Sequence, residues 1–379
     1  MAAEARVDLD VLRSNVATLR ARVQRPLMAV VKADGYGHGM VPAAKAALAG
    51  GADWLAVAHL GEALQLRAAG VTAPLLAWLT VPGERFADAI AADVDLSAGA
   101  VWAVDEVARG AAAAGRTARL QLKADTGLSR GGATAADWPA VVARAQQYEA
   151  EGLVRIVGVW SHFACADEPG HPSVAAQLAS FQAALDYAQA RGVRPELRHL
   201  ANSPATLTLP ESWYDLVRPG LACYGLTPTP QLGGPQRYDL TPAMTLVGRL
   251  AGVKRVPAGA GVSYGHSYLT EHDTTLALVP LGYGDGVPRA ASNAAEVLVA
   301  GERRRIAGRV CMDQFVVDLG DADAAAGDEV VLFGPGTAGE PTAQDWADAL
   351  DTISYEIVTR VGARVPRTYS AAMGEGRAL

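Results

Sequence analysis

The chain has 379 residues, of which 50% are hydrophobic and 19% are charged, and its formal net charge is −7. This composition excludes a disordered, collagen-like or low-complexity protein. We predict a globular protein with a large core, because folding at this length buries roughly 75% of the extended chain's surface. A net negative chain without a basic tract is also a poor candidate for binding nucleic acid.

The sequence gives no sign of a membrane span or a disulfide framework. It has no run of about 18 apolar residues, and its first residues are too acidic for a signal peptide. The three cysteines, Cys165, Cys223 and Cys311, are far apart and form no Cys-x-x-Cys motif. We therefore expect a soluble, cytoplasmic protein without a bound metal.

Short apolar runs alternate with segments of helical period up to about residue 230, a pattern typical of parallel strands joined by crossover helices. Eight such units predict an N-terminal (β/α)8 TIM barrel, and a doubly wound sheet is the alternative. The predicted strands are 26–32, 54–58, 74–79, 94–98, 118–125, 156–163, 197–202 and 216–224. The helical patterns include 41–49, 61–69, 101–114, 138–150 and 174–191.

The pattern changes after a loop-like segment at 228–236 that is rich in Pro and Gly. Short runs separated by turns then predict a mostly antiparallel β domain, followed by one helix over 344–361. The predicted strand segments are 245–256, 274–281, 296–300, 303–317 and 329–333. We place the barrel at residues 8–232 and the β domain at 233–379, and we expect residues 1–7 to join the β domain.

Charged and polar side chains follow several of the predicted barrel strands, at the end where TIM barrels place their active sites. They are Lys32, Lys123, Arg130, His162, Ser203 and Arg218. A positive rim favours an anionic ligand, and Ser203 with the backbone around Gly220 could hold a phosphate. A partly buried lysine can form a Schiff base with an aldehyde. The combination points to pyridoxal 5′-phosphate (PLP).

Residues 29–39, AVVKADGYGHG, resemble the PLP-lysine signature of alanine racemases. The resemblance continues through nearly the whole chain, at 125–127 with Arg130, 201–203, 218–220, 262–265 and 308–314. It implies a barrel followed by a β domain, and a racemase that interconverts L- and D-alanine for bacterial cell-wall synthesis.

The resemblance also implies roles for individual residues. The catalytic bases are Lys32, which carries PLP, and Tyr264. The cofactor contacts are Lys32, Tyr36, His162, Asn202, Ser203, Arg218, Gly220, Leu221 and Tyr355, with Arg218 facing the pyridine nitrogen. Arg130 and the Met312 backbone hold the substrate carboxylate, and the supporting residues are His199, Lys123, Cys311 and Asp313. A substrate corridor is lined by Asp167, Tyr283, Arg289, Arg309 and Ile353. The family forms homodimers with shared active sites, and some members carbamylate the lysine that corresponds to Lys123.

Elementary chemistry supports two bases. Racemisation removes a proton from one face of Cα and delivers another to the opposite face, which two bases do directly. Lys32 supplies one base, and a tyrosine can supply the other if nearby positive charge lowers its pKa from about 10. Because an arginine donates without giving up its proton, Arg218 should leave the pyridine nitrogen unprotonated and a weaker electron sink. The substrate carbanion should then be reprotonated before side reactions intervene.

Other interpretations stay open. The chain could be a serine or broad-specificity racemase, an amino-acid decarboxylase of the same architecture, or a non-catalytic PLP carrier. A decarboxylase is disfavoured by Arg218, because an acidic residue would be expected at the pyridine nitrogen. A carrier is disfavoured by the β domain, which single-barrel carriers lack. The Gly-x-Gly-x-x-Gly pattern at 334–339 is interpreted as a loop because no βαβ unit surrounds it.

Overall fold

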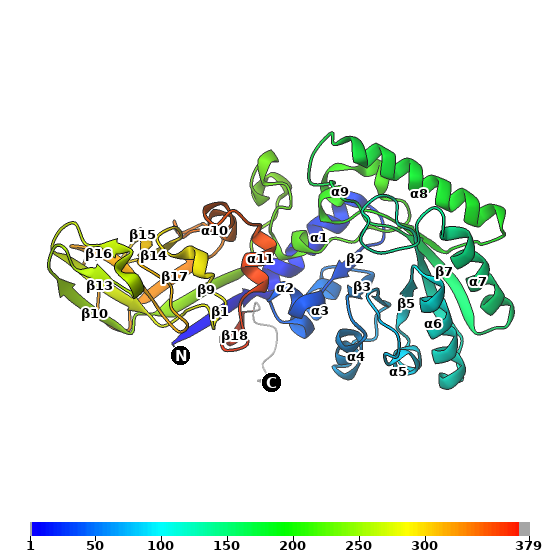
Figure 1. The fold of residues 1–379 in the computed structure, drawn as a ribbon, viewed down its shortest axis with the longest axis horizontal. Coiled ribbons are helices and arrows are strands. Elements are labelled where there is room, and N and C mark those ends of the chain that lie inside the picture. Colours follow the sequence, from blue (N-terminus) through cyan, green and yellow to red (C-terminus); the bar gives the residue numbers. More distant parts are fainter. Residues whose placement is uncertain (1, 371–379) are drawn as a thin grey trace. The chain divides into compact units, whose positions relative to one another are not determined.

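The computed structural model describes residues 2–370. These residues form two compact units (Figure 1). One comprises Arg13–Gly35 and Met40–Leu240, and we call it the barrel unit. The other comprises residues 2–12, 36–39 and 241–370, and we call it the β unit. The short segment Tyr36–Gly39, which follows the predicted cofactor lysine closely, thus belongs to the β unit.

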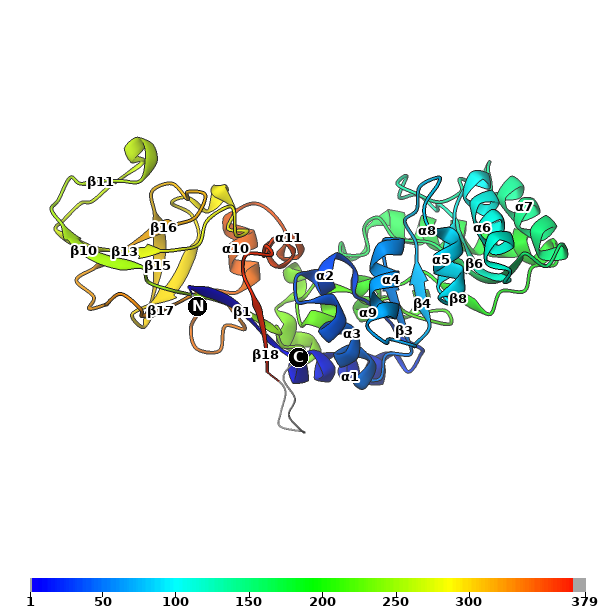
Figure 2. The ribbon, with the colours of Figure 1, turned by 90° about the horizontal axis from the view of Figure 1, so that it is seen from below.

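The barrel unit contains a curled sheet of parallel strands in sequential order, which confirms the predicted barrel architecture. The strands are β2 (Met28–Val30), β3 (Trp54–Val57), β4 (Leu75–Ala77), β5 (Asp95–Ala98), β6 (Ala118–Lys123), β7 (Val154–Trp160) and β8 (Leu197–His199). Helices surround the outside of the sheet (Figures 1 and 2). They are α3 (Met40–Ala49), α4 (Leu60–Ala68), α5 (Phe86–Ala91), α6 (Val101–Ala114), α7 (Trp138–Ala150) and α8 (Pro172–Ala190).

The segment 215–219 closes the sheet in place of a full eighth strand. The backbone N–H of Met28 donates to the Val217 carbonyl at 2.8 Å, and that of Arg218 donates to Ala201 at 2.9 Å. The prediction of a strand over 216–224 is wrong beyond this point, since Leu221–Tyr224 forms a 3₁₀ helix, η2. The physical reason lies just before it, where Pro219 lacks an N–H and cannot continue a ladder.

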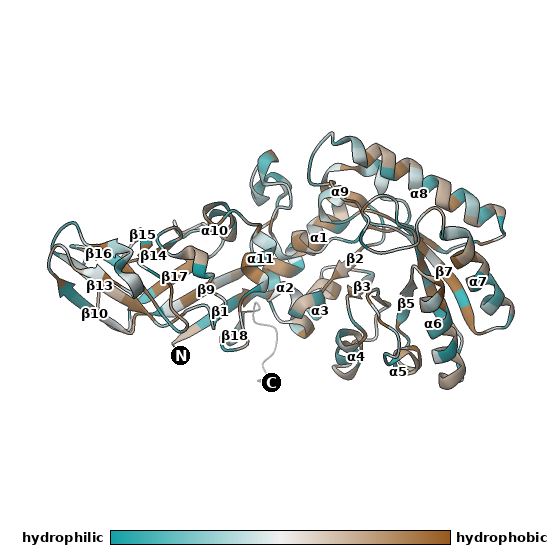
Figure 3. Ribbon diagram, viewed as in Figure 1, coloured by the Kyte–Doolittle hydropathy of each residue, from teal (hydrophilic) through white to brown (hydrophobic). Residues whose placement is uncertain are grey.

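Helix α6 illustrates why these segments fold against the sheet. Its residues Val104, Val107 and Ala111 recur every three or four positions and are buried, so one face packs on the strands. The helix ends where Gly115 adopts φ 62°, the left-handed conformation common at helix C-termini. Figure 3 shows hydrophilic residues on the outer sides of α7 and α8.

The β unit contains a nine-stranded sheet in the order β10-β13-β16-β15-β14-β17-β9-β1-β18. Its pairings are antiparallel except for β1 with β18, which is parallel. The strands are β1 (Ala3–Asp8), β9 (Met244–Arg249), β10 (Gly252–Val256), β13 (Thr274–Val279), β14 (Glu296–Val299), β15 (Glu302–Ala307), β16 (Phe315–Gly320), β17 (Glu329–Phe333) and β18 (Arg367–Ser370). Helix α1 (Leu9–Val23), which the sequence did not predict, follows β1 directly.

The single helix predicted over 344–361 is wrong, because two helices, α10 (Ala343–Ala349) and α11 (Ser354–Thr359), occupy this segment. Asp351 between them has φ 52°, a left-handed conformation that ends the helical path. A new helix then starts after Ile353. Among residues 2–370, no helix is both long and apolar enough to cross a membrane.

Candidate functional site

The residues that the sequence predicts for the site fall into two groups, one in each unit, and each group is described within its own unit. The barrel unit holds Lys32, Lys123, Arg130, His162, Asp167, His199, Asn202, Ser203, Arg218, Gly220 and Leu221. The β unit holds Tyr36, Tyr264, Tyr283, Arg289, Arg309, Cys311, Met312, Asp313, Ile353 and Tyr355.

Lys32 stands at the start of a left-handed turn, α2 (Lys32–Tyr36), which follows strand β2. The φ angles of Ala33, Asp34 and Gly35 are 52°, 53° and 62°, and that of Tyr36 is also 52°. Left-handed conformations cost a non-glycine residue about 1 to 2 kcal/mol each. Such strain persists only where surrounding contacts enforce it, and it is concentrated at functional sites.

Side-chain carboxylates hold this turn in the barrel unit. Glu62 accepts the backbone N–H of Ala33 at 2.7 Å, and Asp34 accepts that of Met40 at 2.9 Å. In the β unit, a Cβ at Gly37 would lie 2.2 Å from the carbonyl oxygen of Val358, so only glycine fits there. The glycine-rich sequence after Lys32 thus serves a close backbone approach as well as the turn.

Positive charges gather around Lys32 in the barrel unit. Burial and the charge of Arg130 lower the pKa of Lys32. Burial, together with Arg130 and Arg218, lowers the pKa of Lys123 to about 8. The pKa of His162 is held well below its usual value, first by burial and then by Arg218 and Arg130. A cluster with this charge favours an anionic ligand, as the sequence predicted.

Two tryptophans lie beside these cations, and neither was predicted from the sequence as part of the site. The Trp160 ring centre lies 4.5 Å from Lys123 Nζ and 4.8 Å from Arg218 Cζ. The Trp78 ring centre lies 5.9 Å from Lys32 Nζ and 5.7 Å from the Trp160 ring. Trp160 directly precedes Ser161 and His162 at the end of a predicted strand, so its position was the available signal. The aromatic faces stabilise the crowded cations.

Arg218 is buried and donates to several acceptors of the barrel unit. Its Nη1 lies 2.9 Å from His199 Nδ1, and its Nη2 donates to the Ser161 carbonyl at 2.7 Å and to that of Leu200 at 3.1 Å. Burial lowers the pKa of Arg218 to about 9, so the guanidinium stays charged at neutral pH. Within residues 2–370, Nε of Arg218 makes no hydrogen bond, which leaves one donor for a ligand.

Ser203 and the segment after Arg218 form a compact cradle. The Ser203 hydroxyl oxygen accepts the Gly220 N–H at 2.8 Å and the Ala222 N–H at 3.4 Å. The Asn202 side chain accepts the Ala205 N–H and caps the short helix α9 (Ser203–Thr208). Leu221 is fully buried beneath this turn. Because Ser203 accepts through its oxygen, its own O–H is oriented for donation elsewhere.

The barrel unit's donor set fits PLP. A phosphate needs hydrogen-bond donors, and the Ser203 hydroxyl offers one. An aromatic ring nitrogen needs one donor, which Nε of Arg218 offers, and an aldehyde needs an amine of lowered pKa, which Lys32 offers. The residues present therefore match the three polar ends of the cofactor.

In the β unit, the two tyrosines predicted to contact the phosphate lie together. The ring centres of Tyr36 and Tyr355 are 6.2 Å apart, with their planes inclined by 45°. Tyr355 belongs to helix α11, and Tyr36 is only 8% exposed. The structure thus brings together two residues more than 300 positions apart in the sequence.

Tyr264 lies at the tip of a two-stranded hairpin formed by β11 (Gly261–Val262) and β12 (Tyr268–Leu269). Its side chain is 72% exposed. The hydroxyl of the preceding residue, Ser263, donates to the Arg309 carbonyl at 2.6 Å and lies 3.4 Å from Cys311 Sγ. The tip that carries Tyr264 is therefore anchored to the segment that carries Met312.

The Met312 segment is held by its carbonyl groups. Tyr283 N–H donates to Cys311 at 3.0 Å, and Gly284 N–H donates to Met312 at 2.8 Å. Asp313 is paired with Arg364 at 2.8 Å. No described residue accepts the N–H of Met312, which is thus available to a carboxylate of a substrate.

The residues expected to line a corridor are distributed over both units. Tyr283 and Ile353 are exposed large side chains of the β unit, and Arg309 lies beside Gly265 on the Tyr264 hairpin. Arg289 begins the 3₁₀ turn η6 (Arg289–Ala291). Asp167 belongs to the barrel unit, where its carbonyl accepts from Gln231. Their corridor role stays a prediction.

Family models cover both units of the chain. The model described as "Alanine racemase, N-terminal domain" matches residues 7–228. The model described as "Alanine racemase, C-terminal domain" matches residues 243–369. The second match covers most of the β unit, which the carrier alternative does not explain.

The chain is also similar to individual proteins over nearly its full length. It is 63% identical to an alanine racemase of Frankia casuarinae, covering 96% of this chain and 95% of the relative. It is 60% identical to an alanine racemase of Thermobifida fusca, covering 98% and 99%. A crystal structure of alanine racemase from D-cycloserine-producing Streptomyces lavendulae matches with a TM-score of 0.97 and 59% identity, covering 98% of each chain.

Proposed function

This chain belongs to the alanine racemase family, a family of PLP-dependent isomerases, and we propose that Lys32 and Tyr264 are the two bases with which it interconverts L- and D-alanine. When bound, PLP withdraws electrons from the substrate Cα and makes its hydrogen acidic. The product D-alanine supplies peptidoglycan synthesis, and we place the enzyme in the cytoplasm. The observation that carries the site assignment is the partly buried Lys32 on a strained turn beside a cluster of cations.

Lys32 acts as one base because its surroundings favour the neutral amine. Burial and the charge of Arg130 both lower the pKa of Lys32. A larger fraction of its side chains is therefore unprotonated at a given pH than for an exposed lysine. The neutral amine would hold the cofactor through its aldehyde, and the Lys32 side chain would accept or return the Cα proton.

Tyr264 acts as the base on the opposite face of the substrate. The hairpin that carries it is anchored by the hydrogen bond from the Ser263 hydroxyl to the Arg309 carbonyl, and Tyr264 is largely exposed. A phenol ordinarily loses its proton near pH 10, so it needs positive charge close by to act at neutral pH. In the homodimer proposed below, such cations would come from the barrel unit of the other chain, through Lys123, Arg130 and Arg218.

Arg218 limits side reactions. Its guanidinium stays protonated, and His162 and His199 beside it remain neutral because burial and Arg218 hold the pKa of each far below the usual value. Arg218 would therefore hold the ring nitrogen through a hydrogen bond without transferring a proton to it. A ring nitrogen held in this way would draw less charge from Cα, and Lys32 and Tyr264 would be the groups that return the proton.

Arg130 and the N–H of Met312 hold the substrate carboxylate. Arg130 is exposed and follows a turn that Asp125 stabilises by accepting the N–H groups of Gly127 and Ser129. An arginine fork and a backbone donor orient a planar carboxylate, which fixes the direction of the Cα–H bond.

The active unit is a homodimer in which the β unit of one chain completes the barrel site of the other. Exposed apolar side chains support this proposal, since Tyr264 is 72%, Met312 54% and Ile353 59% exposed in the single chain. Tyr264 and Met312 lie on segments that the Ser263 side chain connects, and exposed apolar side chains gathered on a surface mark protein interfaces. Two-fold symmetry then gives two composite sites for each dimer.

A racemisation assay of the purified PLP-bound protein across L-amino acids tests the function. We expect alanine to be the best substrate and serine a poorer one, because a pocket discriminates one small group by only about 1 to 3 kcal/mol. Comparable turnover of large or basic amino acids would contradict specificity for alanine and would indicate a broad-specificity amino-acid racemase.

A further inference from the structure

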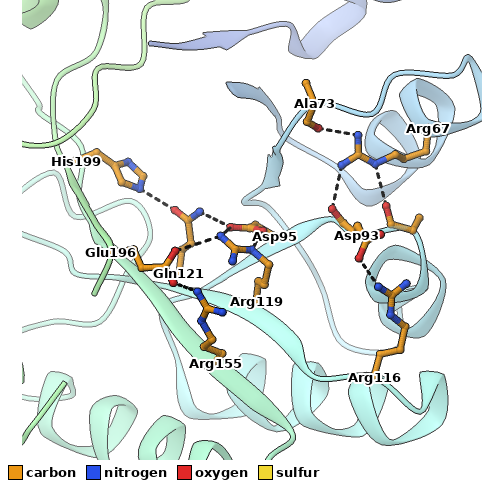
Figure 4. A network of polar contacts seen from close by, with 11 residues as sticks. Arg67, Ala73, Asp93, Asp95, Arg116, Arg119, Gln121, Arg155, Glu196 and His199 are labelled. Atoms are coloured by element: carbon orange, nitrogen blue, oxygen red, sulfur yellow. Dashed lines mark hydrogen bonds and ion pairs between the residues drawn. The ribbon is translucent and has the colours of Figure 1, made fainter. Parts of the chain in front are cut away.

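A chain of buried polar side chains runs through the barrel interior behind Arg218. Arg218 Nη1 contacts His199 Nδ1 at 2.9 Å, and His199 Nε2 contacts Gln121 Oε1 at 2.7 Å. Gln121 Nε2 in turn donates to Asp95 Oδ2 at 2.8 Å, and Arg119 Nε donates to Asp95 Oδ1 at 2.7 Å. Figure 4 shows this chain from His199 to Arg119.

These polar groups lie where barrels are ordinarily filled by branched apolar side chains. His199 and Gln121 are 0% exposed, and Asp95 is 2% exposed. A buried polar network is costly unless every member finds its partner. The backbone makes room for it, since a Cβ at Gly158 would lie 3.0 Å from Oε1 and Cγ of Gln121.

Asp95 fixes the direction of the hydrogen bonds. A carboxylate only accepts, so the Gln121 amide must turn its NH2 group to Asp95 and its carbonyl to His199. The His199 Nε2 must then carry a hydrogen. Burial raises the pKa of Asp95, whereas the hydrogen bond and charge of Arg119 oppose that change and favour the ionised form.

Arg218, at the other end of this series of hydrogen bonds, requires the same tautomer of His199. Arg218 only donates, so the Nδ1 that faces it must offer a lone pair. Both neighbours therefore select the neutral His199 with its hydrogen on Nε2. Trp160 stacks on this ring with an angle of 8° between the planes, which keeps both nitrogens directed along the chain.

We propose that Asp95 and Gln121 are positioning residues that set the tautomer of His199 and thereby hold the Arg218 guanidinium in the orientation that leaves Nε for the cofactor. The inference rests on the role proposed above for Arg218. It assigns a function to two residues, on strands β5 and β6, that lie outside the residues contacting cofactor or substrate.

The test replaces Gln121 by residues of similar length. In Gln121→Met both hydrogen bonds are lost, so nothing fixes which ring nitrogen faces Arg218. A ring that has turned over would present Nε2 to Arg218 and carry its hydrogen on Nδ1. ¹⁵N NMR of histidine-labelled holoenzyme should show one neutral Nε2–H tautomer for His199 in the wild type and its loss in Gln121→Met. The kcat for alanine should fall about tenfold with KM within about twofold, and transamination should take a larger share of turnovers.

Gln121→Glu is the conservative variant, because a protonated carboxyl donates to Asp95 and accepts from His199 as the amide does. It should keep the single tautomer while protonated. Ser212→Ala is the matched control, since it removes another buried hydrogen bond of the barrel unit, from the Ser212 hydroxyl to the Leu209 carbonyl at 2.7 Å. The His199 NMR signals of Ser212→Ala, and the share of its turnovers that end in transamination, should equal those of the wild type.

Unchanged His199 signals in Gln121→Met would overturn the proposal, because Arg218 alone would then fix the tautomer. If Ser212→Ala loses as much activity as Gln121→Met and shows the same increase in transamination, the effect is general destabilisation, and this result would overturn the proposal too. If Gln121→Met does not fold, Asp95→Asn frees the amide to face either way, and a single unchanged tautomer there contradicts the proposal. The NMR result needs no racemase activity, so failure of the proposed function is detected separately, by an inactive wild type.

Discussion

The Ser203 hydroxyl oxygen accepts the backbone N–H of Gly220 at 2.8 Å, across 17 positions of sequence. This bond joins the segment after strand β8 to the segment that closes the barrel. Ser203 is 3% exposed, so the bond is shielded from water. In the proposed site the same hydroxyl donates its hydrogen to the cofactor phosphate.

Ser203→Ala should weaken PLP binding about tenfold, because it removes one donor and leaves the Gly220 N–H without its acceptor. Titration of the apoenzyme with PLP, followed by absorbance, measures the Kd. Thr208→Val on the same helix is the control, since the Thr208 hydroxyl only donates to the Pro204 carbonyl. An unchanged Kd for Ser203→Ala would show that Ser203 does not contribute to cofactor binding.

Lys32→Ala should abolish the visible absorption of the covalently bound cofactor and all racemisation. Borohydride reduction of the wild type, followed by peptide mapping, should find the cofactor on the peptide that contains Lys32. Lys45→Ala, an exposed residue of helix α3, should retain both properties. Labelling of Lys123, whose pKa is also lowered, would contradict the assignment of Lys32 as the lysine that binds the cofactor.

The buried histidines should make the protein less stable in acid. Burial holds the pKa of both His162 and His199 well below the unfolded value of about 6.5. Below that pH the unfolded chain binds protons that the folded chain does not, so the free energy of unfolding falls as pH falls, by up to about 1.4 kcal/mol per pH unit for each histidine.

Urea unfolding between pH 7.5 and pH 5, at fixed protein and cofactor concentrations, measures this slope. His199→Gln should reduce it by the share of one histidine, whereas replacing the exposed His272 by Asn should leave it unchanged. If His199→Gln and the wild type lose stability in parallel, His199 takes up its proton in the folded state, contrary to its surroundings.

Mixing inactive Lys32→Ala and Tyr264→Phe proteins should restore activity if the site is shared. A heterodimer then has one site with both lesions and one with neither. Random exchange makes about half of the dimers heterodimers, so roughly a quarter of all sites regain wild-type composition. No recovery, with exchange demonstrated by differently tagged chains, would mean that each chain completes its own site.

The sequence predicted the barrel well because helical period and apolar runs are local signals. It failed where one residue ended an element, as at Pro219 and at Asp351, and it missed helix α1. The motif residues were found through the resemblance, whereas Trp160, Gln121 and Asp95 were not. Their roles depend on which side of a strand faces the barrel interior and on partners up to 78 positions away, as for Gln121 and His199. Neither the inward-facing side of a strand nor these distant partners can be predicted from the sequence without the register of the sheet.

Exchange of the Cα hydrogen with solvent in Tyr264→Phe tests the two-base assignment most directly. NMR in D2O would follow deuterium incorporation into D-alanine and L-alanine separately, with the PLP-loaded variant. We predict that exchange from D-alanine persists through Lys32, that exchange from L-alanine is lost, and that racemisation stops in both directions. Equal exchange from both enantiomers would show that one base serves both faces and would contradict the assignment of Lys32 and Tyr264 to opposite faces.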